Sequence, residues 1–381
     1  MKDYIVTEIE YGEHRLLAAA FYDELKLSEL TVSDPAHESM VGNIYLGVFD
    51  SYADNIGGAY LRIEGGRKVF LPSVRRGKKP SGRLVVEIVK DASGKKEAVV
   101  SAKIRIAGKY AVMADGHEGL SFSSKLDDEQ RLMIGKWIDP SEYPGCQPLI
   151  RTNAAEATKE MLVKELQALY SLKKSIETEA EGAKSGALLY RPYPFYVEML
   201  RGLYVSPDRV FTDIPAVAER LLPFDPQKSS SSDGLMPGNK TLSLSVLYNL
   251  NRDIQRLLEK NVYLKSGAYI VIEQTEAFVS IDVNTGKCLR GKIPEETYRR
   301  INLEAADEVV RQLRLRNLSG MILVDFISME SQDHKDELVG VMRKLVRHEH
   351  RKTEVIDLTP LGIMEMIRQK AEKPLAEILR G

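Results

Sequence analysis

The stretch that most constrains the fold of this sequence runs from Ala268 to Met329. Residues 269–273 and 277–286 are rich in β-branched and aromatic residues, which predicts a pair of strands. Residues 321–327 form a second apolar run of the kind found in strands that are buried between two layers. A long amphipathic segment separates these strands, so the stretch is predicted to fold as strand, turn, helix and strand, which is typical of an α/β unit.

Acidic side chains occur near the ends of both predicted strands. Because side chains alternate along a strand, Asp282 and Asn284 point to one face, while Ile281 and Val283 point to the other. Asp325 interrupts the second strand. Two neighbouring carboxylates resist ionisation unless a cation neutralises them, and Mg²⁺ accepts one or two carboxylates together with waters and phosphate oxygens. The pattern is compatible with an Mg²⁺ site of Asp282, Asp325 and the Asn284 amide oxygen. It is equally compatible with aspartates that cap strands, accept backbone N–H bonds or pair with arginines.

The helix between the strands is predicted to start at Pro294 and to continue to Arg316, because proline is favoured at the first helical position and apolar residues recur at helical spacing. The other face of this helix is charged. Five arginines on the helix could contact a phosphate backbone or could simply be solvated: Arg299, Arg300, Arg311, Arg314 and Arg316. Further along, residues 335–351 predict a helix, residues 354–358 a strand, and residues 361–368 the start of a final helix.

Composition and charge bound the class of protein. The 381 residues are 43% hydrophobic and 29% charged, which suits a soluble chain of roughly two to four domains. No apolar run of about 18 residues and no leader-like start is present, so we expect a cytoplasmic protein without a membrane span. The two cysteines, Cys146 and Cys288, are far apart and predict neither a disulfide framework nor a cysteine zinc site.

The charge is unevenly distributed. The net charge is −1, but residues 67–109 contain thirteen Lys or Arg against three acidic residues, a net of +10. Electrostatic screening acts over about 8 Å at physiological salt, so acidic regions elsewhere do not cancel this local excess. The segment therefore suits a nucleic-acid partner.

Several short strands with glycine-containing turns are predicted between residues 41 and 113, which favours an OB-fold barrel that binds single-stranded nucleic acid. Tyr60 and Phe70 are the candidates for stacking on bases, although both rings could instead pack in the barrel core. Lys103 and Arg105, in the basic segment, are candidate RNA contacts.

A long helix is predicted from about Ala154 to Ala180, directly after Arg151 and Thr152. By pattern alone, Thr152 would cap this helix and Arg151 would form a surface ion pair.

Three strings in the sequence, IDVNTG, NLEAADEVVRQLRLRNLSGMILVDFISM and LGIMEM, resemble the catalytic segment of the ribonuclease E/G family. The resemblance implies an Mg²⁺-dependent endoribonuclease that acts in RNA processing or decay. Its partner would be single-stranded RNA, either precursor ribosomal RNA or messenger RNA, cut to 5′-phosphate and 3′-hydroxyl ends. At the matching positions, the resemblance implies that Asp282 and Asp325 bind the catalytic Mg²⁺ with support from Asn284.

The resemblance also implies a substrate-binding apparatus. Arg151 and Thr152 match residues that hold the 5′-monophosphate of the RNA, and Lys352 matches a further basic residue of that pocket. Tyr60 and Phe70 match aromatic residues of the RNA-binding barrel. The implied preference is for RNA with a 5′-monophosphate.

The implied architecture is α/β and multidomain. An RNase H-like domain would comprise residues 1–37 and 195–260, an OB-fold barrel residues 38–115, a 5′-phosphate sensor residues 116–194, and a deoxyribonuclease I-like catalytic domain residues 261–381.

The sequence departs from the family pattern in two places. Ser328 stands where the family usually has an aspartate, and no CPxCxG motif is present, so any homo-oligomer would form without the family's zinc link. The alternative function is a non-catalytic RNA-binding protein that retains the family fold.

Overall fold

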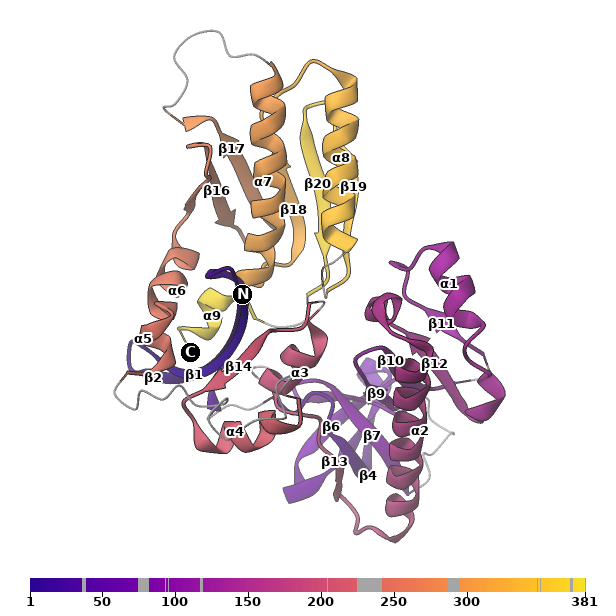
Figure 1. The fold of residues 1–381 in the computed structure, drawn as a ribbon. Helices are drawn as coiled ribbons and strands as arrows, with labels where there is room; N and C mark the ends of the chain where they lie inside the picture. The colour runs from indigo at the N-terminus through magenta and orange to yellow at the C-terminus, as the bar shows by residue number, and fades with distance from the viewer. Residues whose placement is uncertain are drawn as a thin grey trace. The chain divides into compact units, whose positions relative to one another are not determined.

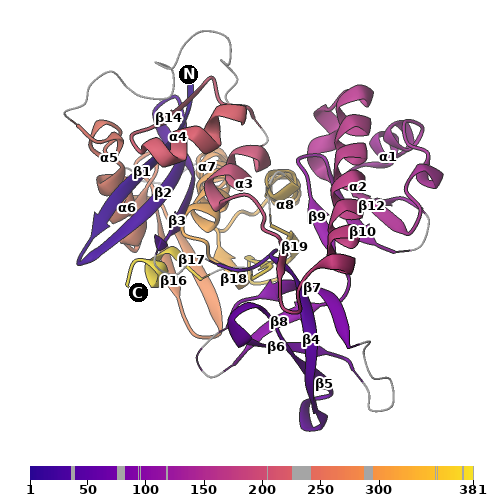
Figure 2. The same cartoon turned by 90° about the horizontal axis from the view of Figure 1, so that it is seen from below.

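The computed structural model describes residues 1–35, 39–74, 82–92, 94, 96–116, 119–203, 205–224, 242–286, 295–347, 349, 351–370 and 373–380. The chain divides into a split unit, Met1–His37 with Phe195–Gly381, and an inserted unit, Glu38–Pro194 (Figures 1 and 2). Each unit has hydrophobic cores of its own. None of the helices within the described ranges is both long and apolar enough to cross a membrane.

The split unit contains two sheets. The first includes β3 and β14, which are the last strand before the inserted unit and the first strand after it. Its strands lie in the order β14, β1, β2, β3, with β1 parallel to β14 and the other pairs antiparallel. Helices pack on both faces of this sheet. The strands are β1 (Lys2–Tyr11), β2 (His14–Asp23), β3 (Lys26–Ser33) and β14 (Arg209–Thr212), and the helices are α3 (Phe195–Gly202), α4 (Pro215–Leu221), α5 (Leu244–Leu247), α6 (Leu250–Leu258) and α9 (Leu375–Ile378). The identification of this part as RNase H-like stays a prediction.

The second sheet of the split unit has six strands in the order β15, β16, β17, β18, β20, β19. Strands β17 and β18 are parallel, and the helix α7 connects them, whereas the other pairs are antiparallel. Helices α7 and α8 lie side by side on one face (Figure 1). The elements are β15 (Asn261–Tyr263), β16 (Tyr269–Gln274), β17 (Phe278–Asn284), α7 (Glu295–Leu315), β18 (Gly320–Asp325), α8 (Gln332–Arg347), β19 (Thr353–Leu358) and β20 (Ile363–Arg368). The predicted strand, helix, strand order is confirmed; Pro294 and Cys288 lie outside the described residues.

One predicted element of this sheet is wrong. Residues 361–368 were expected to start a helix, but they include strand β20, which pairs with both β18 and β19. Leucine, methionine and glutamate favour a helix by intrinsic propensity. The alternation of buried and more exposed side chains instead matches a strand. Met364 and Met366 are at most 1% exposed and reach the core under α7 and α8, while Glu365 points to the other face of the sheet.

Two further expectations about this sheet need correction. Strand β18 is not buried between two layers: Ile322 and Val324 are fully buried, whereas Met321 is 53% exposed, so helices cover only one face of the strand. Of the five arginines on or directly after α7, four are not simply solvated, because they bind groups within the split unit, whereas Arg300 is exposed. The partners are Glu296 and Glu337 for Arg299, Glu308 and the Leu27 carbonyl for Arg311, Glu349 for Arg314, and the Glu259 carbonyl for Arg316.

The inserted unit contains the expected barrel. Five strands follow one another around it in the order β4, β5, β6, β8, β7, and pairing of β4 with β7 closes it. Alternate side chains such as Leu61, Val69 and Ile88 fill the interior. The closed barrel of an OB-like domain is therefore present. The strands are β4 (Ile44–Ala53), β5 (Gly58–Arg62), β6 (Lys68–Pro72), β7 (Arg83–Lys90) and β8 (Ala98–Ser101).

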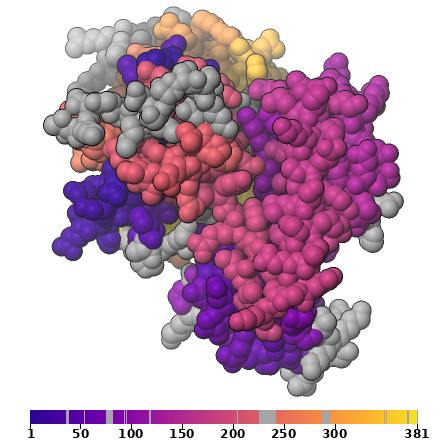
Figure 3. All heavy atoms as spheres, turned by 60° about the horizontal axis from the view of Figure 1, so that its bottom comes forward, coloured from indigo at the N-terminus to yellow at the C-terminus, as the bar shows by residue number. Residues whose placement is uncertain are grey.

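A second, four-stranded sheet completes the inserted unit, in the order β11, β12, β10, β9, with the long helix α2 packed against it. Ile44 and Leu46 of the barrel share this core, and the space-filling view shows magenta residues of this part covering one side of the violet barrel (Figure 3). The elements are β9 (Arg105–Ala107), β10 (Ala111–Asp115), β11 (Ser121–Phe122), α1 (Asp128–Gly135), β12 (Cys146–Ile150) and α2 (Lys159–Gly182), and β13 (Leu188–Tyr190) pairs with β4.

Candidate functional site

Asp282 and Asp325 meet at the carboxyl ends of two neighbouring parallel strands. They are direct partners in the register of β17 and β18, and both are exposed. Their neighbours Ile281, Val283 and Val324 are at most 6% exposed and point to helices α7 and α8. The two carboxylates therefore lie on the opposite face of this sheet, which we call the open face. Adjacent strands lie about 4.8 Å apart. The structure therefore brings the two predicted acidic residues together on one face.

Asn284 lies on the same face as Asp282, two residues further along β17. Its Nδ2 donates a hydrogen bond of 2.7 Å to Asp282 Oδ2, which orients that carboxylate. None of the described residues donates to the carboxylate of Asp325, and no arginine in the described part of the chain pairs with either aspartate. The alternative in which the aspartates serve as strand caps or arginine partners is therefore not what the structure shows.

The turn after β17 is held by a close backbone contact. Gly286 has φ of +72°, and a Cβ at this position would lie 2.4 Å from the carbonyl oxygen of Gly267. Only glycine fits here without displacing the hairpin that precedes β16. The contact fixes the direction in which the chain leaves Asp282 and Asn284.

The donor set at this face fits a hard cation that retains water. Two carboxylates and one amide oxygen are too few for a closed protein cage, and the described residues contain no group of three or more His, Cys, Asp and Glu that could hold a metal. Mg²⁺ normally binds through one or two carboxylates and fills its remaining positions with water or phosphate oxygens. Ser328, where the resemblance implies an aspartate, is exposed in the loop after β18.

Sequence reasoning missed one acidic residue of this face. Glu365 of β20 lies opposite Leu323 of β18, and its neighbours Met364 and Met366 point to the helices. Its side chain is therefore on the open face, two positions along the strand pair from Asp325, whose own partner is Ile363. The alternating pattern of residues 363–367 could have revealed it, but the prediction of a helix there hid it.

Tyr60 and Phe70 form a pair on the outside of the barrel. They are register partners on β5 and β6, with ring centroids 5.7 Å apart, and Nζ of Lys68 lies 4.9 Å from the centre of the Tyr60 ring. The residues that alternate with them, Leu61 and Val69, are fully buried in the barrel. The alternative in which both rings pack in the core is therefore wrong.

Gly58 makes room for the outer aromatic pair. A Cβ at this position would lie 2.4 Å from the Phe70 ring, so the ring lies directly against the β5 backbone. Lys103 and Arg105 are exposed in the same unit, and the Arg105 backbone N–H donates to Glu87. Two half-buried rings and several cations are thus available to a ligand on the surface of the inserted unit.

Arg151 and Thr152 follow β12 and have defined partners. Nη1 of Arg151 donates to the Gly108 carbonyl at 2.5 Å, and Oγ1 of Thr152 lies 3.1 Å from Oγ of Ser123. The cap of helix α2 is Thr158, not Thr152, and no described acidic residue pairs with Arg151. Both pattern-based alternatives for these residues are therefore wrong.

Glu165 of α2 fixes the loop that orients Arg151. Its carboxylate accepts hydrogen bonds from three successive backbone N–H groups, those of Lys109, Tyr110 and Ala111, at 2.6 to 3.0 Å. This carboxylate holds the backbone next to Gly108, whose carbonyl receives the Arg151 guanidinium. The sequence shows only one of many glutamates on a helix, so this role was not predicted.

Lys352 belongs to the split unit, whereas Arg151 and Thr152 belong to the inserted unit. It is exposed directly before β19, and its Nζ lies 2.8 Å from Glu354. Its assignment to the phosphate pocket stays a prediction.

Comparison with known proteins identifies relatives of the whole chain. The ribonuclease E of Synechocystis sp. is 29% identical over 394 residues, and the ribonuclease G of Salmonella typhimurium is 27% identical over 394 residues. These alignments cover 97% and 94% of this chain.

The relatives are longer than this chain. It spans 58% of the Synechocystis protein, 57% of the ribonuclease E of Nostoc sp. and 79% of the Salmonella ribonuclease G. The family model described as "Ribonuclease E/G family" matches residues 105–371, which include both aspartates, Arg151 and Lys352. This chain belongs to the ribonuclease E/G family.

Proposed function

We propose that this chain is an Mg²⁺-dependent endoribonuclease that cuts single-stranded RNA and leaves 5′-phosphate and 3′-hydroxyl ends. The observation that carries the proposal is the register pairing of Asp282 with Asp325 on one exposed face. Membership of the ribonuclease E/G family supports it, since the relatives carry the names ribonuclease E and ribonuclease G. RNA processing or decay is the corresponding role.

The residues of the open face would have different roles in this reaction. Asp282 and Asp325 would hold the ion, and Asn284 would keep the Asp282 carboxylate turned toward it. When bound, Mg²⁺ polarises a phosphate oxygen and lowers the pKa of an attacking water. The strand ends present both carboxylates to solvent, so a phosphodiester can approach without a change in the sheet.

The inserted unit would supply substrate binding. Tyr60 and Phe70 would stack on bases, and Lys103 and Arg105 would attract the phosphate backbone. Arg151 and Thr152 would bind a 5′-monophosphate and favour RNA that carries one.

A single factorial assay tests this function. One single-stranded RNA is prepared with a 5′-monophosphate and with a 5′-hydroxyl, and each form is incubated with the chain in Mg²⁺ or in EDTA. We expect internal cuts only in Mg²⁺. A charge-assisted contact to the phosphate contributes about 1.5–3 kcal/mol, so the monophosphorylated form should be cut about tenfold faster or more. Arg151→Ala should remove this advantage, whereas Lys136→Ala, which removes an exposed cation of the same unit, should keep it.

The outcomes separate the two candidate functions. Tight RNA binding without Mg²⁺-dependent cutting would favour the alternative, an RNA-binding protein that retains the family fold. Equal rates on both RNA forms, or a preference that survives Arg151→Ala, would remove the phosphate-sensing role and leave the nuclease proposal standing.

The aromatic pair on the barrel gives a separate prediction for RNA affinity. Base stacking contributes about 1–3 kcal/mol per base, so Tyr60→Ala and Phe70→Ala should each weaken RNA binding by about tenfold. Neither ring fills the barrel core, and the thermal stability of the variants should therefore change little. Tyr263→Ala, which removes a tyrosine that is 74% exposed on β15, is the matched control. Unchanged affinity in both barrel variants, measured by fluorescence anisotropy, would contradict stacking at this site.

A further inference from the structure

The backbone that follows Asp325 is held from helix α7. Sheet pairing of β18 ends at Asp325, and α8 begins at Gln332. Between them, Asn302 of α7 makes two hydrogen bonds to Ile327: Nδ2 donates to the carbonyl at 2.8 Å, and Oδ1 accepts from the N–H at 3.0 Å. This amide satisfies the same two backbone groups that a neighbouring strand would satisfy.

Asn302 is 0% exposed, and it lies among the apolar residues with which α7 packs on the sheet. A buried amide that lacks partners costs about 1–3 kcal/mol, so an apolar residue would be the simpler choice for helix packing alone. Its two bonds instead go to the residue that lies two positions after Asp325.

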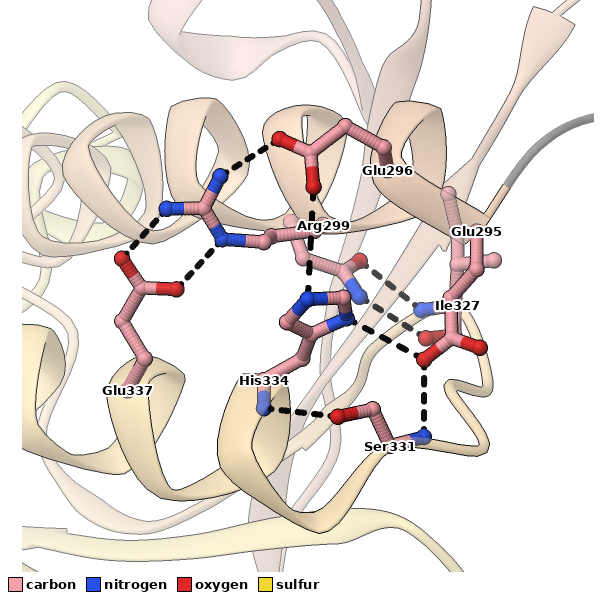
Figure 4. A network of polar contacts seen from close by, with 8 residues as sticks. Glu295, Glu296, Arg299, Ile327, Ser331, His334 and Glu337 are labelled. Carbon is pink, nitrogen blue, oxygen red and sulfur yellow. Dashed lines mark hydrogen bonds and ion pairs between the residues drawn. The ribbon is translucent and has the colours of Figure 1, made fainter.

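A second residue of α7, two turns earlier on the helix, also binds the backbone of this segment. Oε1 of Glu295 accepts the backbone N–H of Ser331 at 2.7 Å and lies 3.1 Å from Nδ1 of His334 in the first turn of α8 (Figure 4). The Ser331 N–H is the main reason why the pKa of the Glu295 carboxyl is lowered. The segment from Asp325 to α8 is thus tied to α7 at both of its ends.

The two metal-binding candidates differ in how they are oriented. Asp282 receives a direct hydrogen bond from Asn284, whereas none of the described residues donates to the carboxylate of Asp325. Asp325 is the last residue of β18 that pairs in the sheet. The direction of its side chain therefore depends on this pairing and on the path of the chain that follows it, and the bonds to Ile327 and Ser331 hold that path. Residues that hydrogen-bond directly to a metal ligand typically change metal affinity by about 10–100-fold when they are replaced, and for residues that act through the backbone we expect the lower end of this range.

We propose that Asn302 and Glu295 are positioning residues that hold the chain after Asp325 and so set its carboxylate for the divalent ion. The inference rests on the proposed function, and it extends the site from the strand ends to the first turns of α7.

The adjacent residue on the helix provides a matched control. Glu296 lies at the same end of α7, with a side chain that is 66% exposed, and it pairs with Arg299 at 2.6 Å. It touches side chains only and does not bind the backbone of residues 326–331. Removing it changes the charge and the α7 to α8 contacts without releasing the segment.

The test measures metal binding directly, with Mn²⁺ titrated into the purified chain and followed by electron paramagnetic resonance. We expect Glu295→Ala and Asn302→Ser to weaken Mn²⁺ binding by about tenfold, and Glu296→Ala to leave it unchanged. In RNA cleavage, the same two variants should need about tenfold more Mg²⁺ for half-maximal rate, with an unchanged KM for RNA at saturating Mg²⁺.

Because Asn302 is buried, its variant is compared by thermal unfolding, and Glu295→Ala decides the question if Asn302→Ser does not fold. Parent-like Mn²⁺ affinity in Glu295→Ala, in a chain whose cleavage is lost on Asp325→Asn, would overturn the inference while the nuclease function stands. A parent chain that binds Mn²⁺ with the expected loss in both variants, but does not cut RNA, would support the positioning roles and overturn the nuclease function. A parent chain that binds no Mn²⁺ would overturn both.

Discussion

Asp282→Asn and Asp325→Asn are each expected to lower the rate of Mg²⁺-dependent RNA cleavage by about a thousandfold while the fold stays intact. Asparagine keeps the size of the side chain but removes the negative charge that holds the cation. A bound divalent ion contributes several kcal/mol of transition-state stabilisation, and each 1.36 kcal/mol corresponds to a tenfold change in rate, which gives about three orders of magnitude. Both carboxylates are exposed and lack ion-pair partners among the described residues, so neither substitution orphans a buried charge.

Single-turnover cleavage over a range of Mg²⁺ concentrations measures this effect, with thermal unfolding of each variant alongside. Mg²⁺ should raise the unfolding temperature of the parent chain, because it binds only the folded state, and it should not do so for the variants. Glu273→Gln is the control, since this acidic residue lies on the same open face, on β16, but pairs with Lys260. Parent-like rates in both asparagine variants would end the proposal of a metal site at these strand ends.

The meeting of Asp282 and Asp325 could be foreseen because its signals are local. Each aspartate ends an apolar strand, and one long helix joins the two strands. A helical crossover between neighbouring strands makes them parallel, and parallel strands end at the same edge of the sheet. What the sequence did not reveal is that only one face of β18 is covered, so that the carboxylates are open to solvent.

Strand β20 was missed because its signals conflict. Met364, Glu365 and Met366 are good helix formers, but their alternation matches a strand with one buried face. The pairing partners that decide between these two outcomes, β18 and β19, are set by tertiary structure. Glu365 was lost from the candidate site for the same reason.

The arginines of α7 show a different limit. Their positions on the helix are readable, but their partners lie far along the chain: Glu337 for Arg299, Glu349 for Arg314 and the Leu27 carbonyl for Arg311. Helical periodicity gives the direction of a side chain and says nothing about which element packs there. The hydrogen bonds of Asn302 with Ile327 and of Glu295 with Ser331 could not be predicted from the sequence for the same reason.

Glu349 is expected to be the most sensitive of the charged residues to truncation. Its side chain is 1% exposed, and it lies 3.3 Å from Nη2 of Arg368 on β20 and 3.0 Å from Nη1 of Arg314 on α7. Arg368 is itself only 3% exposed, and burial lowers the pKa of its guanidinium despite the nearby carboxylate. Glu349→Ala leaves this cation buried with the Leu318 carbonyl as its other partner, so the free energy of unfolding should fall by about 3–5 kcal/mol.

Urea unfolding followed by circular dichroism measures this loss, and two comparisons identify its cause. Glu354→Ala removes a carboxylate that pairs with Lys352 on the surface, where both side chains are more than half exposed, and it should cost less than about 1 kcal/mol. The double variant Glu349→Leu, Arg368→Met removes both buried charges, and it should be markedly more stable than Glu349→Ala because the buried Arg368 cation is removed with its partner. Arg314 also loses Glu349, but its side chain is 25% exposed to water. A double variant as unstable as the single one would instead trace the loss to packing around β20. Strand β20 is the antiparallel neighbour of β18, which carries Asp325. That outcome would therefore also mean that the stability of this strand pair depends on the packing of its side chains and not on this ion pair.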